Sequence, residues 1–141
     1  VDGIHQHNQG VLMHGPTFMA NPLACAIANA SIKLLISSPW QQRVKTIEQQ
    51  LQLELAQCRT NNNVIDVRVK GAIGVVELNQ NVDAGILCQE FVKLGVWIRP
   101  FGRLIYLMPP YIISSKDLSQ LTQAIYHVIN KFYPSQSVMD L

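Results

Sequence analysis

Charged residues are scarce in this sequence, and they form no run. Lys and Arg number 11 against 9 Asp and Glu, which gives a formal net charge of +2. Segments that bind nucleic acid or an anionic membrane surface concentrate basic residues in one stretch. Because the cations of this chain are scattered singly, we expect no nucleic-acid partner and no membrane partner.

Cysteine is scarce as well. The chain has 3 cysteines, Cys25, Cys58 and Cys88, which lie far apart without a C-x-x-C pair. An odd number of widely spaced cysteines does not make a disulfide framework. We therefore expect three free thiols in a reducing, cytoplasmic setting.

Metal-ligand spacing is missing too. The one cluster of histidines, His5, His7 and His14, stands near the N-terminus. Zinc sites set His beside Cys or carboxylates at characteristic intervals, and no such set accompanies this cluster. We expect no metal site.

Long hydrophobic runs are also absent. The longest stretch of low charge, residues 23–36, carries Asn29, Ser31 and Lys33, and it is too short to cross a bilayer. The first residues are polar, unlike a secretory signal. We expect neither a membrane span nor a signal peptide.

What the sequence does have is the composition of a globular domain. Its 141 residues are 48% hydrophobic and 14% charged, which is enough to build one buried core. The chain opens with Val1 and about a dozen residues of loop character. We expect it to be a piece of a longer protein.

Hydrophobic periodicity predicts four helices and four short strands. Helix start signals are Ser38 with Gln41, Asp83, and Ser114 with Asp117, while Gly95 suits a helix end. The predicted helices are residues 23–36, 39–58, 83–94 and 114–132, and the predicted strands are residues 64–69, 72–78, 96–99 and 104–107. The short connections favour an α+β fold with a largely antiparallel sheet and helices on one face. Gly74, inside a strand, indicates a bulge or a close neighbour.

The loop of residues 14–22, just before the first helix, has the make-up of an anion site. Gly15 permits close backbone approach, Pro16 stiffens the chain, and Thr17 offers an N–H and a hydroxyl together. A helix start adds favourable electrostatics for an anion. A plain turn with the same residues is the alternative.

Arg99 is the second candidate. It follows apolar residues and precedes Pro100, and a guanidinium in apolar surroundings requires an anionic partner, ideally a carboxylate. The alternative is an edge-strand arginine that faces solvent. Phe101 and Tyr106 are pocket candidates that we expect to be core residues instead, and we expect Arg103 to be a solvated turn residue.

The loop resembles a known family. His14-Gly15-Pro16-Thr17-Phe18, followed by Asn21-Pro22-Leu23-Ala24-Cys25, is similar to the class III aminotransferases, which depend on pyridoxal phosphate. The resemblance implies that Pro16 and Thr17 contact the cofactor phosphate of a neighbouring subunit, and hence a homodimer. It also implies that the backbone of Gly15 lines the substrate site.

A second stretch, residues 96–112, resembles the branch of this family that acts in biotin synthesis. That branch transfers an amino group from S-adenosylmethionine to 8-amino-7-oxononanoate and forms 7,8-diaminononanoate. The resemblance implies that Arg99 binds the carboxylate of 8-amino-7-oxononanoate.

The resemblance also implies that the chain is part of a fold-type-I transferase. It further implies how the chain divides into segments. Residues 1–22 would be a phosphate-binding loop segment from the end of a large domain. Residues 23–37 would be a connecting helix, residues 38–134 a small C-terminal domain, and residues 135–141 a frayed tail.

Part of the family's active site has no counterpart here. None of the six lysines stands in the family's Schiff-base context: Lys33, Lys45, Lys70, Lys93, Lys116 and Lys131. That lysine forms the covalent bond to the cofactor and shuttles the proton. We expect the isolated chain to be inactive.

Two alternatives remain open. The first is another class III aminotransferase, acting on ornithine or an ω-amino acid. The second is a non-catalytic α+β interaction domain, which predicts a hydrophilic surface. A piece of an aminotransferase predicts exposed apolar residues on the first helix and its preceding loop.

Overall fold

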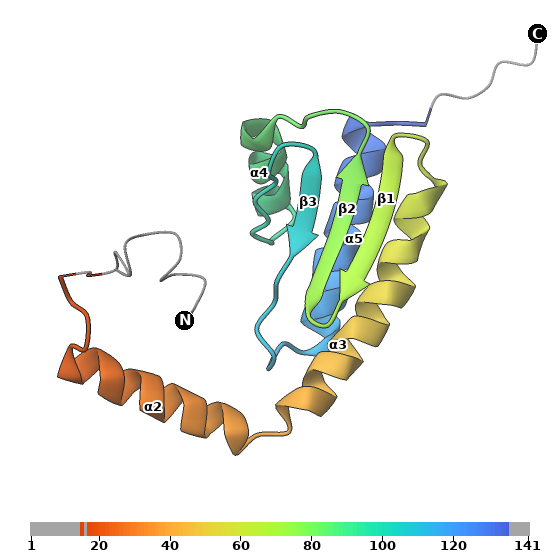
Figure 1. Cartoon of the computed structure of the whole chain (residues 1–141). Coiled ribbons are helices and arrows are strands. Elements are labelled where there is room, and N and C mark those ends of the chain that lie inside the picture. The colour runs from red at the N-terminus through yellow and green to blue at the C-terminus, as the bar shows by residue number, and fades with distance from the viewer. Residues whose placement is uncertain (1–14, 16, 136–141) are drawn as a thin grey trace, which may run out of the picture. The chain divides into compact units, whose positions relative to one another are not determined.

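The computed structural model describes residues 15 and 17–135. By its internal contacts the chain divides into two compact units, Val1–Ser38 and Pro39–Leu141. The described helices and strands follow one another in the order α2, α3, η1, β1, β2, α4, β3 and α5 (Figure 1).

The first unit contains one described helix, α2 (Pro22–Ile36). The Asn21 side chain accepts a hydrogen bond from the N–H of Ala24 at 3.1 Å and so caps the helix. Pro22 occupies the first turn, where its missing N–H leaves no intrahelical bond unmade. No residue of α2 is buried, so the helix has no packed face among the described residues.

The second unit is built on an antiparallel sheet of β1 (Val64–Lys70), β2 (Ile73–Leu78) and β3 (Leu104–Leu107). The strand order is β1-β2-β3. Gly71 makes the tight turn between the first two strands with a φ of 56°, a conformation that favours glycine. The sheet therefore forms from short connections, as the sequence predicts.

The strand register places one set of side chains on the inner face. Val67 of β1 pairs with Val76 of β2, which pairs with Ile105 of β3, and all three are buried. Since side chains alternate across a strand, this row fixes the face that packs on the helices. The register shifts between Val64 and Asp66, where β1 has an irregularity.

Helices cover that inner face. They are α3 (Trp40–Leu55) with its 3₁₀ continuation η1 (Ala56–Thr60), α4 (Ala84–Lys93) and α5 (Ser115–Phe132). Figure 1 shows α5 running across the back of the sheet, with α3 along the edge beside β1. The largest fully buried core side chains include Phe91, Leu51 and Ile125. The predicted α+β class, with helices on one face, is confirmed.

Gly74 of β2 lies where α3 presses on the sheet. A Cβ at this position would stand 2.7 Å from Cδ1 of Leu55, which is itself fully buried. The predicted close neighbour is thus confirmed, whereas the register of β2 is regular at Gly74.

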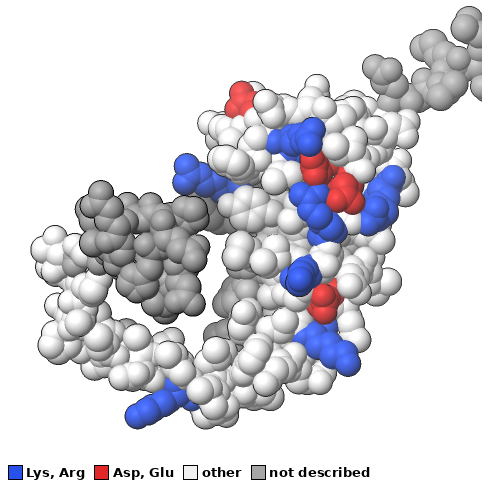
Figure 2. Space-filling model, viewed as in Figure 1, with Lys and Arg blue, Asp and Glu red and all other residues white. Residues whose placement is uncertain are grey.

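The outer face of the sheet is charged. Arg68 pairs with Asp66 at 2.8 Å and with Glu77 at 2.6 Å, and Arg103 pairs with Glu77 at 2.7 Å. Figure 2 shows basic and acidic side chains interspersed down the sheet face that is turned to the viewer. The hydrogen bond from Arg68 lowers the pKa of the Asp66 carboxyl. This ion-pair network marks the face that lies opposite the core.

Two local predictions are wrong. Residues 96–99 form no strand. Val96 instead donates its N–H to the carbonyl of Phe91, and Pro100 has no N–H to offer to a neighbouring strand. Ser38 does not cap α3. Its hydroxyl donates to the carbonyl of Leu35 in the preceding helix at 2.8 Å, so no capping box forms with Gln41.

Within residues 17–135, no single helix is long and apolar enough to cross a membrane. The pair formed by Pro22–Ile36 and Trp40–Thr60 reaches that length and composition only when the two helices are counted together across a break.

Candidate functional site

The predicted anion loop lies in the first unit. Gly15 and Thr17 are exposed, and residues 17–20 form a turn in which the N–H of Asn21 donates to the carbonyl of Phe18 at 3.2 Å. A Cβ on Gly15 would meet no atom within 4 Å. Packing within the described chain therefore does not demand glycine at this position. Pro16 and the histidines at positions 5, 7 and 14 lie outside the described residues.

Arg99 lies in the second unit, in the segment that connects α4 to β3. Burial alternates along this segment: Trp97 and Arg99 are exposed, while Ile98 and Pro100 are buried. Ile98 thus anchors the segment in the core and turns the neighbouring side chains outward. Within residues 15 and 17–135, no ion pair involves the Arg99 guanidinium.

A cavity of about 340 Å³ opens beside Arg99. Its lining comes from the Arg99 segment, from β3 and the residues that follow it, and from α5: Trp97, Ile98, Arg99, Tyr106, Leu107, Met108, Pro109, Pro110 and Leu121. Arg99 is the one charged residue in that lining. Such a cavity suits a ligand with a carboxylate at one end and a hydrocarbon body.

The aromatic candidates lie elsewhere than in the core. Phe101 is 74% exposed and Tyr106 is 37% exposed, so the prediction that they are core residues is wrong. Tyr106 lies on the outer side of β3 and lines the Arg99 cavity, whereas Phe101 lines a separate cavity beside Arg68 and Arg103. Arg103, which we expected to be a solvated turn residue, is half-exposed and forms an ion pair with Glu77.

Of the residues that line the Arg99 cavity, the sequence indicated only Arg99 and Tyr106, and it missed among others Trp97 and Leu121. Trp97 stands two positions before Arg99, and residues two apart share a side in an extended segment, so that spacing could have indicated it. Leu121 comes from α5. No spacing in the sequence links it to Arg99, because only the packed fold brings α5 beside this segment.

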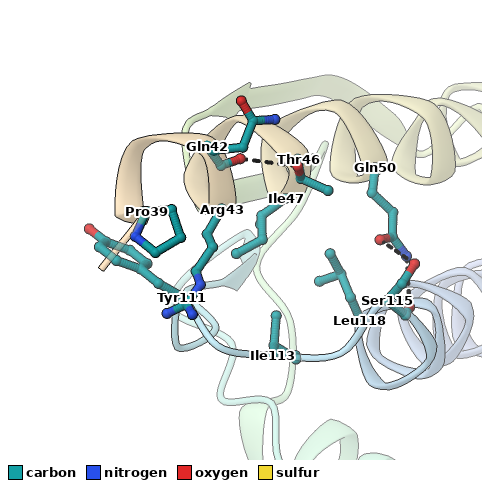
Figure 3. A pocket seen from close by; sticks show the side chains of 10 residues that line it. All are labelled: Pro39, Gln42, Arg43, Thr46, Ile47, Gln50, Tyr111, Ile113, Ser115 and Leu118. Atoms are coloured by element: carbon teal, nitrogen blue, oxygen red, sulfur yellow. Dashed lines mark hydrogen bonds between the residues drawn. The ribbon is translucent and has the colours of Figure 1, made fainter. Parts of the chain in front are cut away.

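A second cavity, of about 180 Å³, lies between α3 and the segment before α5. Figure 3 shows Arg43 and Tyr111 at one end and the hydrogen-bonded pair of Gln50 and Ser115 at the other. Its floor includes Ile47. None of the predicted site residues lines this cavity, so we assign none of the predicted chemistry to it.

No group of three or more His, Cys, Asp or Glu side chains in residues 15 and 17–135 is arranged to hold a metal ion. The buried thiol of Cys58 is not a nucleophile candidate either, since burial raises its pKa to about 11. The candidate chemistry of the described chain therefore lies with Thr17 and Arg99, in two separate units.

The chain belongs to the class-III aminotransferase family, whose model matches residues 4–129. The adenosylmethionine-8-amino-7-oxononanoate aminotransferase of Corynebacterium glutamicum is 50% identical over 120 residues, which are 85% of this chain and 28% of that protein. The ornithine aminotransferase of Macrococcus caseolyticus is 34% identical over 120 residues, 84% of this chain and 29% of that protein.

A solved structure supports the same fold. The adenosylmethionine-8-amino-7-oxononanoate aminotransferase of Methanocaldococcus jannaschii matches with a TM-score of 0.73 at 25% identity, covering 85% of this chain and 30% of that one. This chain thus spans less than a third of the length of these relatives. The predicted relationship to the class III aminotransferases is confirmed.

Proposed function

We propose that the chain contributes part of the active site of an aminotransferase that moves the amino group of S-adenosylmethionine to 8-amino-7-oxononanoate, forming 7,8-diaminononanoate for biotin. The observation that carries the proposal is Arg99, the single charge in an otherwise uncharged cavity. The identity of 50% to a relative with this printed activity, against 34% to an ornithine aminotransferase, supports the choice of substrate.

Arg99 binds the carboxylate of the acceptor in this proposal. Its planar guanidinium offers two parallel N–H donors, which match the two oxygens of a carboxylate. An acceptor with a carboxylate at the end of a hydrocarbon chain therefore gains both affinity and a fixed orientation from this residue.

The apolar lining accommodates the hydrocarbon chain of the acceptor. Trp97, Met108 and Leu121 offer surfaces without charge beside Arg99. Apolar contact along the chain removes water from it, while the carboxylate is held at one end.

Thr17 and Pro16 contact the cofactor phosphate in this proposal, and Gly15 borders the substrate. The exposed Thr17 hydroxyl and N–H fit a phosphate oxygen, and the open space around Gly15 allows a ligand to approach the backbone. Bound pyridoxal phosphate supplies the electron sink for amino-group transfer. The proposal includes a homodimer, in which the Thr17 loop serves the neighbouring subunit, and a cytoplasmic location.

The exposed apolar residues of the first unit favour this proposal over a free-standing interaction domain. They include Phe18, Leu23, Ile27, Leu34 and Ile36. A domain that works alone keeps such residues sparse on its surface. We propose that these residues contact the remainder of the enzyme or its second subunit.

A hybrid enzyme tests the proposal. The matched 120-residue segment of the Corynebacterium glutamicum relative is replaced by that of this chain. The purified hybrid receives pyridoxal phosphate, S-adenosylmethionine and 8-amino-7-oxononanoate, and mass spectrometry measures 7,8-diaminononanoate. We expect product formation. Amination of the keto partner of ornithine, with 8-amino-7-oxononanoate left untouched, would assign the chain to another branch of the family.

The role of Arg99 is tested in the same hybrid with a matched pair of arginine variants. Arg99→Ala removes a charged hydrogen bond worth about 1.5–3 kcal/mol, so KM for 8-amino-7-oxononanoate should rise roughly 10- to 150-fold. Arg103→Ala should leave that KM nearly unchanged, because Arg103 does not line the Arg99 cavity. An equal rise in KM for the two variants would show that Arg99 has no special role in binding the acceptor.

A further inference from the structure

Arg99 has no regular secondary structure of its own to hold it. Residues 96–100 form neither helix nor strand, and a binding site needs its charged group fixed closely in place. Whatever orients Arg99 must therefore act from neighbouring elements. One of these elements is α4, which ends just before this segment.

A Schellman motif joins α4 to the Arg99 segment. The N–H of Val96 donates to the carbonyl of Phe91 at 3.0 Å, and the N–H of Gly95 donates to that of Val92 at 3.0 Å. Gly95 has a φ of 75°, the left-handed conformation that this motif needs. The direction in which the chain leaves α4 is thus set by the helix itself.

A second contact reaches the residue next to Arg99. The thiol of Cys88 on α4 donates to the carbonyl of Ile98 at 3.5 Å. The side chain of Ile98 is buried in the core. The backbone on the N-terminal side of Arg99 is therefore tied to α4 at two points, Val96 and Ile98.

An ion pair also joins α4 to α5, beside the core packing of Leu87 and Phe91. Glu90 is 7% exposed, and its carboxylate contacts Nζ of Lys131 on α5 at 2.5 Å. Lys131 and then Lys93 lower the pKa of the Glu90 carboxyl, which keeps it ionised at neutral pH. Lys93 lies on α4 itself, at 3.3 Å, so of the two lysines only Lys131 joins Glu90 to another helix. The side chain of Gln120 on α5 also donates to the carbonyl of Leu94, at the end of α4, at 3.3 Å.

We propose that the Glu90–Lys131 ion pair positions Arg99, by fixing α4 on α5 and thereby the segment that α4 carries. Lys131 and Glu90 do not line the Arg99 cavity, so they act as positioning residues and not as ligands. This inference rests on the proposed function, in which Arg99 binds the acceptor carboxylate. It predicts that a residue outside the cavity controls recognition of one end of the substrate.

The first test measures whether the contact of Lys131 with Glu90 holds the Arg99 segment in place, and it requires no enzyme activity. Hydrogen exchange of the backbone amides is followed in the 141-residue chain with Lys131→Met, Lys131→Arg or Lys93→Met. We expect Lys131→Met to speed exchange at Val96, whose N–H holds the Schellman motif. Exchange at Val76, in the middle of the sheet, should stay slow, which shows that the fold persists. Lys131→Arg should restore slow exchange at Val96.

Lys93→Met is the matched control. It also takes a lysine from Glu90, but from the same helix, so α4 stays attached to α5. Exchange at Val96 should remain as in the unsubstituted chain. If Lys131→Met and Lys93→Met behave alike, in either direction, the inference is overturned.

The second test uses the hybrid enzyme with two acceptors, 8-amino-7-oxononanoate and its methyl ester. A misplacement of about 1 Å can cost roughly 100-fold, so Lys131→Met should raise KM for the acid by about 10- to 100-fold. KM for the ester should change little, because the ester has no carboxylate for Arg99. An equal rise for acid and ester would mean general damage and would overturn the inference. If the unsubstituted hybrid fails to aminate the acid, the proposed function fails, and hydrogen exchange alone decides whether Lys131 holds the segment.

Discussion

Helices α2 and α5 begin with the same kind of cap but differ in burial. Asn21 caps α2, and Ser114 caps α5 by accepting a hydrogen bond from the N–H of Asp117. Yet α5 has buried residues along its length and α2 has none. Local signals thus suffice to start a helix, whereas burial depends on surfaces that other parts of a protein provide.

The apolar residues of α2 also differ in pattern from those of α5. They surround α2 instead of forming one stripe, and a helix that is apolar all round is normally enclosed by protein. The second unit, in contrast, has a closed core between its sheet and its helices. The comparison predicts that substitutions in the second unit destabilise the chain and that equivalent ones in α2 do not.

Phe91 and Ile27 should show the largest difference. Phe91 is fully buried in the core, while Ile27 on α2 is 61% exposed. Phe91→Ala should lower the free energy of unfolding of the second unit by about 3–5 kcal/mol through cavity formation. Ile27→Ala should change it by less than about 0.5 kcal/mol. Urea unfolding followed by circular dichroism measures both, and a large loss for Ile27→Ala would show that α2 is packed in solution.

The cysteines extend the comparison to chemical reactivity. Cys25 on α2 is exposed, whereas burial raises the pKa of Cys58 from 9.0 to about 11. Two pKa units lower the thiolate fraction near neutral pH by about 100-fold. Iodoacetamide should therefore modify Cys25 at least about 100-fold faster than Cys58, as peptide mass spectrometry can measure. Equal rates would mean that the core opens readily.

The same pKa shift gives a dependence of stability on pH. A buried thiol with a raised pKa favours the folded state fully below its ordinary pKa and loses this contribution as pH rises through the folded value. The second unit should therefore weaken between pH 9.0 and about 11. Cys58→Ala should lack this component of the alkaline transition, and an unchanged transition would assign it to other groups.

Two glycines provide a further matched pair. A Cβ at Gly74 would stand 2.7 Å from the buried Leu55, while one at Gly15 would meet no atom within 4 Å. Gly74→Ala should cost about 1–3 kcal/mol through overpacking, measured by urea unfolding. Gly15→Ala should leave stability unchanged and should weaken cofactor or substrate binding in the hybrid enzyme. A destabilising Gly15→Ala would indicate a packing role for that glycine instead.

The sequence is sufficient for most of the second unit because its signals are local. Hydrophobic period, the Asp83 and Ser114 caps and the Gly71 and Gly95 turns place the helices and three strands close to their observed bounds. The predicted strand at residues 96–99 failed because of local bonding. The Val96 N–H is already bonded to the carbonyl of Phe91 at the end of α4, and Pro100 has no N–H to offer to a neighbouring strand.

The site is only partly readable in the sequence, because part of it is assembled by contacts between residues that are distant in sequence. Arg99 is indicated by its apolar flanks, and Thr17 by its loop, but their roles stay predictions. The cavity wall from α5 and the ion pair between Glu90 and Lys131 join residues that are distant in sequence. Only the packing of α4 and α5 reveals them.

The helix caps allow a direct comparison between the two units, and their removal has the smallest expected effect on the free energy of unfolding. Asp83 accepts a hydrogen bond from the N–H of Ile86 at 3.0 Å at the start of α4. Asp83→Ala should lower the free energy of unfolding of the second unit by about 1 kcal/mol, since it leaves helix N–H groups without a partner. Asn21→Ala removes the equivalent bond from α2. It should reduce helical circular dichroism before the urea transition and leave the midpoint of that transition in place.

Both variants are measured in the same urea titration, with Ser114→Ala as a second cap variant of the second unit. Ser114→Ala should shift the midpoint as Asp83→Ala does, because the helix that it caps packs on the core. The contrast with Asn21→Ala follows from burial alone: fraying the start of a helix with no buried residue exposes no core. If Asn21→Ala moved the midpoint as far as Asp83→Ala, the two units would unfold together. In that case α2 would owe its helical state to contacts made in solution, and its apolar surface would already be partly covered.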